Sequence, residues 1–524
     1  MTRTTNLPSR ALHVGAKLTL AVMLAGALAL PAFAQTITAA MQTNPPTLDP
    51  HMTTTTATQQ VAIHVFEPLV VYGEDYSTVL PMLAASWEAS DDDLIYTFTL
   101  REGVLFHNGK ELRAEDAVAS LDRIRTHSPV SGFYEGVSTI EVTGDYTFEV
   151  TLDQPIDLIA SMAVPVTWQG IMPKEQADAA GSNELRVGEL IGTGPFELSA
   201  WRPDVEVVLD RFEGYAAVDI PASGFGGHKE ALVEQVRFVP VREVGSRIAG
   251  LETGEYHFAE ALPITAMGRL EDNTNVEPLV AMPLWGVAWE INKQEPPMDN
   301  VYFRRAVLAA LDMDFIMRTV AMGDPNFYRV QPGRFYPEQT ALYSDACAEE
   351  YNRADPDYAR ELLEQAGYDG EDIVILSNRD YDWMYRATLA AAPQLEQAGI
   401  NVRLEFSDWP SQIGKALTLE DWHINQTGWS LNFNLTDLKG GLQSGAPYAY
   451  GYENPDMDAA LERASFLLSP EELRASADEI QCMILTDVPY IRFGDLFGLE
   501  AVRTTLDGYA SWYVVPRFWN VSLD

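Results

Sequence analysis

The sequence predicts an α/β protein with more than one lobe, and three observations support this prediction. The chain has 524 residues, which is too many for one ordinary hydrophobic core. Its composition, with 47% hydrophobic and 10% aromatic residues, is typical of a folded globular protein. Helical patterns alternate with short strand-like segments, and between residues 383 and 406 a helix leads directly into a strand, as in α/β folds.

The first 34 residues have the three parts of a secretory signal. A basic segment contains Arg3, Arg10 and Lys17. The apolar run from Leu18 to Leu30 has 13 residues, whereas a membrane-spanning helix needs roughly 20. The triplet Ala32-Phe33-Ala34 matches a cleavage site. We therefore expect residues 1–34 to be a cleaved signal peptide and the mature chain to lie outside the cytoplasm, with no membrane insertion. The alternative is an uncleaved anchor.

Residues 94–127 predict a strand, a turn and a helix. From Leu94 to Leu100 apolar and polar side chains alternate, which indicates a half-buried strand, and Val104–Phe106 continues it. Asn108-Gly109 favours a turn. A helix then begins near Ala114, with acidic residues in its first turn that suit the helix dipole.

The helices of the second half have clear beginnings and ends. Asn300 is a plausible N-cap for a helix that continues to Leu311. Asp355-Pro356 has the residues expected at an N-cap and at the first helical position, and Gly367 ends that helix. Gly399 ends a long helix that starts near Trp383.

The last 130 residues or so continue the mixed pattern. Val402–Phe406 is predicted to be a strand, and helices are expected near 456–467 and 470–485. Tyr490–Phe493 and Trp512–Val515 both have the composition of strands.

The charge excludes some partners. The formal net charge is −41, or −44 once the three positive charges of residues 1–34 are removed. Nucleic-acid binding needs a basic surface, so nucleic acid is excluded as a partner. Docking on anionic lipid is disfavoured for the same reason. An acidic surface by itself indicates only solubility.

Cys347 and Cys482 are the two cysteines of the chain. In an oxidising compartment such a pair is a candidate disulfide. The alternative is two separate buried thiols, because the sequence does not show whether the two residues are close.

No catalytic or metal-binding motif stands out. The patterns H-E-x-x-H, G-x-S-x-G, G-x-G-x-x-G and the P-loop are absent from the sequence. The eight histidines are scattered, and none lies three to five residues from another, as a local metal pair would require. We therefore expect no catalytic residues, no metal and no cofactor.

Recognisable motifs are spread over nearly the whole chain. The first is Pro46-Thr47-Leu48-Asp49-Pro50, and the longest is PMLAASWEASDDDLIYTFTLREGVLFHNGKELRAEDAVASLDRI, from Pro81 to Ile124. Gly192-Thr193-Gly194-Pro195-Phe196 follows, and then come LETGEYHFAE, NVYFRRAVLAALD and ARELLEQAGYDG. Each motif, in this order, resembles a landmark of the extracytoplasmic solute-binding proteins of family 5, the oligopeptide, dipeptide and nickel-binding type.

The resemblance implies a two-lobed periplasmic binding protein fold with a hinge, a ligand cleft and an inserted third subdomain. Lobe I would comprise residues 35–80, 192–283 and 495–524. The inserted subdomain would be 81–191 and lobe II 284–494, with crossings near Trp285–Asn292 and Phe493–Gly498. The hydrophobic periodicity of residues 284–494 also indicates an α/β structure, but it does not predict the boundaries of the lobes.

The resemblance also implies a function. The protein would be the monomeric periplasmic component of an ABC importer, which captures a short peptide or peptide-like solute and delivers it to a membrane permease with cytoplasmic ATPases. A non-peptide solute is the first alternative: an opine, a modified amino acid, an oligosaccharide or a metal chelate. A periplasmic chaperone or sensor on the same fold is the second, and a secreted hydrolase the third.

Candidate ligand-binding residues follow from the same resemblance. Arg379, after the strand-like Val374–Leu376, resembles in context an arginine that binds the ligand carboxylate in dipeptide-type relatives. A guanidinium suits a carboxylate because it donates two parallel hydrogen bonds. Trp429 resembles the G-W segment that enters the cleft. Weaker candidates for the wall of the cleft are Trp285, Trp409, Tyr381 and Trp383, and the alternative for each of them is a structural role.

The stretch after Trp429 departs from the pattern. Dipeptide-type relatives continue into an acidic segment whose aspartate pairs with the ligand amine, whereas here Leu431–Asp437 keeps one acid, Asp437. A buried ammonium without an acid is costly. Either Asp437, Asp380 or Asp382 binds the amine, or the ligand is not a free-amine peptide.

Overall fold

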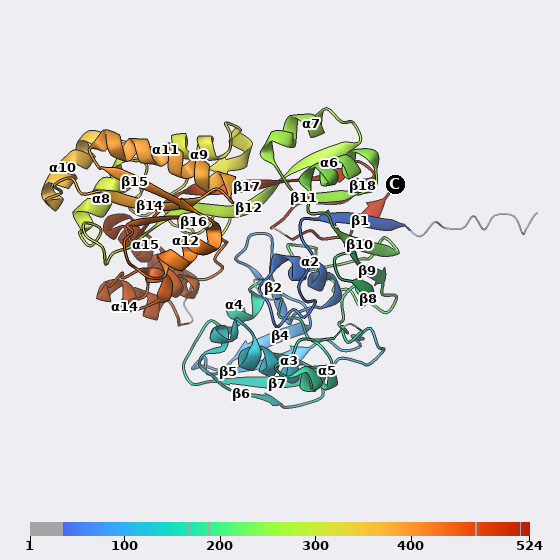
Figure 1. The fold of residues 1–524 in the computed structure, drawn as a ribbon. Coiled ribbons are helices and arrows are strands. Elements are labelled where there is room, and N and C mark those ends of the chain that lie inside the picture. Colours follow the sequence, from blue (N-terminus) through green and yellow to red (C-terminus); the bar gives the residue numbers. More distant parts are fainter. Residues whose placement is uncertain (1–34, 166–167, 187, 467–468, 514) are drawn as a thin grey trace, which may run out of the picture.

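The computed structural model describes residues 35–524 apart from 166–167, 187, 467–468 and 514. The predicted signal peptide, residues 1–34, lies outside the described residues. One sheet of 11 strands runs through most of the molecule (Figure 1). Its spatial order is β15 (Val402–Ser407), β14 (Ile373–Asn378), β16 (Ile424–Trp429), β12 (Val276–Ile291), β17 (Tyr490–Arg503), β11 (Phe258–Leu262), β1 (Thr36–Met41), β10 (Gln235–Pro240), β9 (Glu206–Arg211) and β8 (Phe196–Arg202), with β13 (Tyr328–Arg329) paired to β17.

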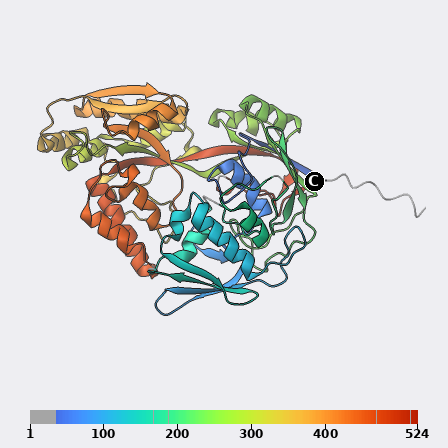
Figure 2. The same ribbon diagram turned by 60° about the horizontal axis from the view of Figure 1, so that its bottom comes forward.

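Two long antiparallel strands, β12 and β17, connect the two halves of the molecule (Figures 1 and 2). Their register runs from Val276 opposite Arg503 to Glu290 opposite Tyr490. At one end β17 pairs with β11, and at the other end β12 pairs with β16. The predicted crossings lie within these two strands. We keep the predicted lobe ranges as our proposal for the lobes.

Helices cover the sheet on the side of β14–β16. Four of them enclose a hydrophobic core on one face, and α12 packs on the other face with Trp422 and Tyr450. The helices of this half are α8 (Val301–Ala310), α9 (Met313–Val320), α10 (Pro356–Ala366), α11 (Asp382–Ala398), α12 (Trp409–Ala416), α13 (Lys439–Leu442), α14 (Pro455–Arg463) and α15 (Pro470–Asp487), with the 3-10 turns η3 (Pro325–Phe327), η4 (Ala348–Glu350), η5 (Leu435–Leu438) and η6 (Pro447–Ala449).

The predicted helix boundaries are confirmed here. The Asn300 side chain accepts a hydrogen bond from the Tyr302 backbone, and Asp355 caps α10 in the same way. Gly367 and Gly399 adopt the left-handed conformation that ends a helix at little cost.

The other half carries its own helices and a separate antiparallel sheet. The sheet lies at the bottom of Figure 1, in the order β4 (Ala84–Ala89), β5 (Ile95–Leu100), β7 (Thr147–Leu152) and β6 (Val137–Val142). The remaining elements of this half are α2 (Thr56–Val65), α3 (Ala114–His127), α4 (Leu158–Ala163), α5 (Lys174–Ala180), α6 (Val244–Thr253), α7 (Met267–Glu271), η1 (Ser131–Tyr134), η2 (Ile264–Ala266), and the pairs β2 (Val70–Tyr72) with β3 (Val79–Pro81) and β18 (Leu506–Asp507) with β19 (Ser522–Leu523).

A buried ion pair explains the P-x-T-L-D-P motif. The Asp49 carboxylate accepts hydrogen bonds from Arg123 Nη1 at 3.0 Å and Nη2 at 2.6 Å, and from the Leu185 backbone at 2.9 Å. Burial alone would raise the pKa of Asp49, but Arg123 and the His51 ring hold it below its usual value. The motif therefore ties the segment after β1 to α3 in the predicted inserted subdomain.

The G-T-G-P-F turn lies directly against the end of α2. A Cβ at Gly192 would lie 2.0 Å from the Val65 carbonyl oxygen, and one at Gly194 would lie 2.3 Å from the His64 carbonyl oxygen. Glycine is therefore required at both positions by close backbone approach.

One predicted strand is wrong. Trp512 and Tyr513 are irregular, and Val514 lies outside the described residues. Tyr513 has a positive φ of 58°, outside the extended region of a regular strand, and the Trp512 ring stacks on Tyr76 at 4.8 Å between centroids. The aromatic composition therefore serves packing in a loop.

Cys347 and Cys482 are joined by a disulfide bond, with their Cα atoms 5.0 Å apart. The bond connects the segment before α10 to α15. Among the described residues, no helix is long and apolar enough to cross a membrane.

We predict that Asp49→Asn lowers the free energy of unfolding by about 3–5 kcal/mol, because Arg123 is left as an unpaired buried charge. Asp178→Asn, which removes the exposed Lys174–Asp178 pair, is the matched control and should cost less than about 1 kcal/mol. Denaturant unfolding of both variants measures the difference. Equal losses would contradict the prediction.

We predict that the double substitution Cys347→Ser and Cys482→Ser lowers the free energy of unfolding by about 4–5 kcal/mol, because the bond closes a loop across 135 residues. Wild-type protein unfolded in a reducing agent should lose the same amount. A double variant as stable as the oxidised wild type would refute this.

Candidate functional site

A cavity of about 470 Å³ lies beside strands β12 and β16. Small-solute sites in proteins fall in this size range. Its lining residues come from strands, from α12, from η5 and α13, and from loops. They are Glu290, Lys293, Arg334, Trp409, Ile413, Thr427, Trp429, Asp437, Leu438, Gly440, Gly441, Leu442, Tyr448, Tyr450, Pro489 and Tyr490.

Aromatic rings form much of the wall. The Trp429 and Tyr490 rings meet edge to face at 4.5 Å between centroids. Tyr450 is buried against Trp422, whereas Tyr448 is 55% exposed at the rim. Such rings offer large contact areas to a ligand at little entropic cost.

Two buried charges in the wall already have partners. The Glu290 carboxylate accepts hydrogen bonds from Asn425 Nδ2 at 2.9 Å and Trp429 Nε1 at 3.3 Å, and burial raises its pKa. The Lys293 ammonium donates to the Pro489 carbonyl at 2.9 Å. Burial, reinforced by Arg304, holds the pKa of Lys293 well below its ordinary value. Glu290 therefore orients the Trp429 ring, and that indole N–H is no longer free for a ligand.

Asp437 caps the turn that follows Trp429. Its Oδ2 accepts hydrogen bonds from the Phe433 backbone at 2.8 Å and the Asn434 backbone at 3.3 Å. Burial raises the pKa of this carboxyl, although Arg334 acts in the opposite direction. One aspartate thus both lines the cavity and fixes the backbone of residues 433–437.

Arg334 is the lining residue that the sequence did not single out. Its guanidinium carbon lies 4.3 Å from the centroid of the Trp429 ring and 5.9 Å from that of Tyr490. Burial lowers the pKa of Arg334 to about 10, and the Arg492 charge adds to this shift. Arg334 lies in an irregular loop without a helix or strand period, so no periodicity could reveal it.

The predicted site residues fall into three groups. Trp409, Trp429 and Asp437 line the cavity. Asp380 and Tyr381 lie behind Trp409: Asp380 Oδ2 accepts a hydrogen bond from the Trp409 backbone at 2.8 Å, and the Tyr381 and Trp409 rings are 5.5 Å apart.

The remaining candidates lie elsewhere. The Arg379 guanidinium carbon is 5.2 Å from the Tyr385 ring and 5.4 Å from the Phe406 ring, and Arg379 is not among the lining residues. Trp285 lies in β12 opposite Leu496, also outside the lining set. Asp382 forms an ion pair with Arg386 on α11.

The segment after Trp429 reaches the other half of the molecule. Leu431 and Phe433 are buried in the hydrophobic core that contains β2 and the four-stranded sheet. The Phe433 ring stacks on Tyr72 at 5.2 Å between centroids, and Tyr72 Oη donates to the Phe433 carbonyl at 3.4 Å. We call residues 430–442 the bridging segment, because one end touches the opposite half and the other end lines the cavity.

Comparisons with known proteins agree with this architecture. The family model of the bacterial extracellular solute-binding proteins, family 5, matches residues 78–439. A probable peptide ABC transporter periplasmic-binding protein of Sinorhizobium fredii, y4tO, is 28% identical over 94% of this chain and 96% of its own length. The glutathione-binding protein GsiB of Salmonella typhi is 28% identical over 88% of this chain and 90% of its own length.

A solved structure shares the fold. The dipeptide-binding protein from Pseudoalteromonas sp. SM9913, in complex with Met-Leu, superposes with a TM-score of 0.74 at 20% identity, over 94% of this chain and all of that one (100%). The predicted two-lobed periplasmic binding protein fold is therefore confirmed, and the chain belongs to the bacterial extracellular solute-binding proteins of family 5.

Proposed function

We propose that this protein is the periplasmic receptor of an ABC importer, which captures a short peptide or peptide-like solute and delivers it to a membrane permease with cytoplasmic ATPases. The observation that carries the proposal is the cavity of about 470 Å³, with aromatic walls and both signs of charge. The relative described as a probable peptide ABC transporter periplasmic-binding protein supports the peptide class.

Binding and release would use the two-strand connection. Rotation of the predicted lobes about β12 and β17 closes the cleft, excludes water and strengthens each polar contact to the solute. The permease would recognise the closed form. This cycle needs no nucleophile, cofactor or second copy of the chain, so we propose a monomeric binding protein without catalytic activity that residues 1–34 direct to the periplasm.

Most of the predicted residues have a role in this proposal. The rings of Trp409 and Trp429 would pack against the ligand, and Asp437 would bind its amine. Asp380 and Tyr381 would hold Trp409 in position. Arg379 would have to leave the Tyr385 and Phe406 rings to bind a ligand carboxylate, and Trp285 would contribute only through the hinge strand β12.

The class of solute is tested directly. The protein is expressed with residues 1–34, purified from the periplasm and denatured, and the released small molecules are identified by mass spectrometry. A short peptide or a mixture of peptides, in near-stoichiometric amount, supports the proposal. A single opine, modified amino acid, oligosaccharide or metal chelate keeps the receptor function and refutes the peptide class. An empty protein that no solute stabilises against heat would favour a chaperone or sensor.

We predict that Trp429→Ala weakens binding of the released solute roughly thirtyfold, because the ligand loses about 2 kcal/mol of buried ring contact. Tyr302→Ala is the control, since Tyr302 is a 42% exposed aromatic residue on α8. Calorimetry on both variants measures the effect. Unchanged affinity in Trp429→Ala would remove the cavity from the proposed site.

A further inference from the structure

The Arg334 guanidinium has no hydrogen-bonding partner within the part of the chain that the structure describes. The guanidinium lines the cavity, and its flat face packs on the Trp429 ring. None of the hydrogen bonds or ion pairs recorded for the described residues involves its side-chain nitrogens. The five N–H donors at the edge of the guanidinium are therefore available to a molecule in the cavity.

A guanidinium with unused donors in a cavity is suited to bind an anion. A cation taken partly out of water is costly unless it is paired and hydrogen-bonded, and the planar fork of arginine matches a carboxylate in a two-bond geometry. Lys293, the other lining cation, already donates to a carbonyl oxygen. Lys293 thus uses one of its three donors within the protein, whereas none of the side-chain donors of Arg334 is used by a described residue.

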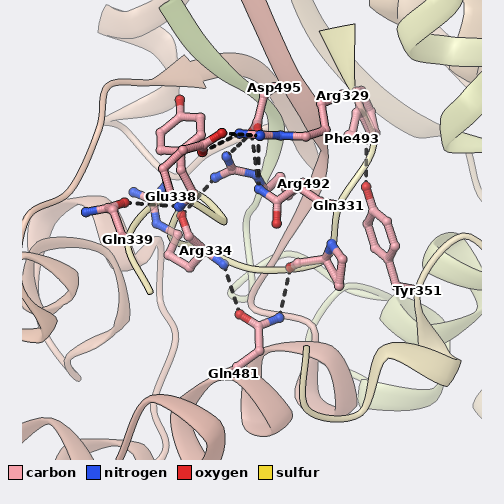
Figure 3. Close-up of polar contacts among 12 residues, drawn as sticks. Arg329, Gln331, Arg334, Glu338, Gln339, Tyr351, Gln481, Arg492, Phe493 and Asp495 are labelled. Carbon is pink, nitrogen blue, oxygen red and sulfur yellow. Dashed lines mark hydrogen bonds and ion pairs between the residues drawn. The ribbon is translucent and has the colours of Figure 1, made fainter. Parts of the chain in front are cut away.

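The backbone around Arg334 is held on both sides (Figure 3). Gln481 Oε1 accepts from the Arg334 backbone N–H at 3.0 Å, and Gln481 Nε2 donates to the Pro332 carbonyl at 2.8 Å. Arg492 Nη1 donates to the Arg334 carbonyl at 3.0 Å. A side chain on a fixed loop loses little entropy when it binds a ligand.

Arg492 is in turn held by Asp495. Asp495, buried, forms an ion pair with it and also accepts from Arg329 Nε at 3.0 Å and Gln331 Nε2 at 3.2 Å. A Cβ at Gly286 would lie only 3.0 Å from Arg492 Nη1, so glycine makes room for the guanidinium. Figure 3 shows Arg329, Gln331 and Arg492 converging on Asp495.

The same cavity also contains two acidic side chains. Asp437 and Glu290 line it together with Arg334, so a molecule with separate positive and negative ends would meet both signs of charge. We infer that Arg334 binds the free carboxylate of the solute, the role that the sequence assigned to Arg379, and that the site selects solutes with a free carboxylate end. The inference rests on the proposed receptor function.

The test uses two dipeptide libraries that cover every pair of standard amino acids, one as free acids and one as C-terminal amides. Full-length mature protein is incubated with each library, and the retained dipeptides are identified by mass spectrometry. Dissociation constants of the best-retained dipeptide and its amide are then measured by calorimetry. Wild type should bind the acid roughly ten- to hundredfold more tightly than the amide, and Arg334→Met should bind the two alike.

Three further variants make the outcome specific. Arg360→Met, an exposed arginine of α10 paired with Asp357, should keep the wild-type preference for the acid. Arg334→Lys keeps the charge but not the fork, and should keep only part of the preference; it serves if Arg334→Met does not fold. Arg379→Met should keep the full preference.

Each result decides the matter. Arg334 variants that retain the full acid preference overturn the inference, and loss of that preference in Arg379→Met alone gives the role to Arg379. A wild type that binds acids and amides equally overturns the inference but leaves the receptor function intact. A wild type that retains dipeptides from neither library overturns the inference and excludes dipeptides as the solute, whereas the proposed peptide class is decided by the molecules released from the periplasmic protein.

Discussion

The pairing of β12 with β17 is the constraint on which the rest of the structure depends. These strands connect the two halves, and their ladder is interrupted where Val287 faces Gly494 but Ala288 faces Arg492, so Phe493 is an extra residue. Residues three apart in a regular strand point to opposite faces. The bulge cancels this, and Arg492 and Asp495 meet in a buried ion pair. The strands that connect the lobes therefore also hold the loop that carries Arg334.

The bridging segment, residues 430–442, connects the wall of the cavity to the contact between the two halves of the molecule. Phe433 packs among the aromatic rings of the opposite half, whereas Asp437 and Leu438 line the cavity. Asp437 joins the two ends because its carboxylate holds the backbone of Phe433 and Asn434. A solute that contacts Asp437 would therefore act on the same turn that positions Phe433 between the lobes.

The family, the fold class and most of the local structure follow from the amino-acid sequence alone. Helix ends at Asn300, Asp355, Gly367 and Gly399 depend on side-chain capping or on a positive φ, and both are properties of a few consecutive residues. The ordered motifs were enough to identify the family, and three of the nine candidate site residues, Trp409, Trp429 and Asp437, line the cavity. The strand predicted from the composition of Trp512–Tyr513 is wrong, because the packing of Trp512 against Tyr76 outweighs the strand propensity of these residues.

Only the tertiary structure decided which charges share the cavity. Arg334, Asp437 and Glu290 are separated by up to 147 residues, and they meet because β12, the irregular loop that carries Arg334 and the turn η5 converge there. Arg379 has a favourable sequence context, but its guanidinium lies on the α11 side of the sheet with Tyr385 and Phe406. The irregular loop that carries Arg334 has no helical or strand periodicity in its sequence, so the sequence does not predict its conformation. The backbone of this loop is held by hydrogen bonds to Gln481 and Arg492, which are distant in sequence. The position of the Arg334 side chain is therefore decided only when the chain folds.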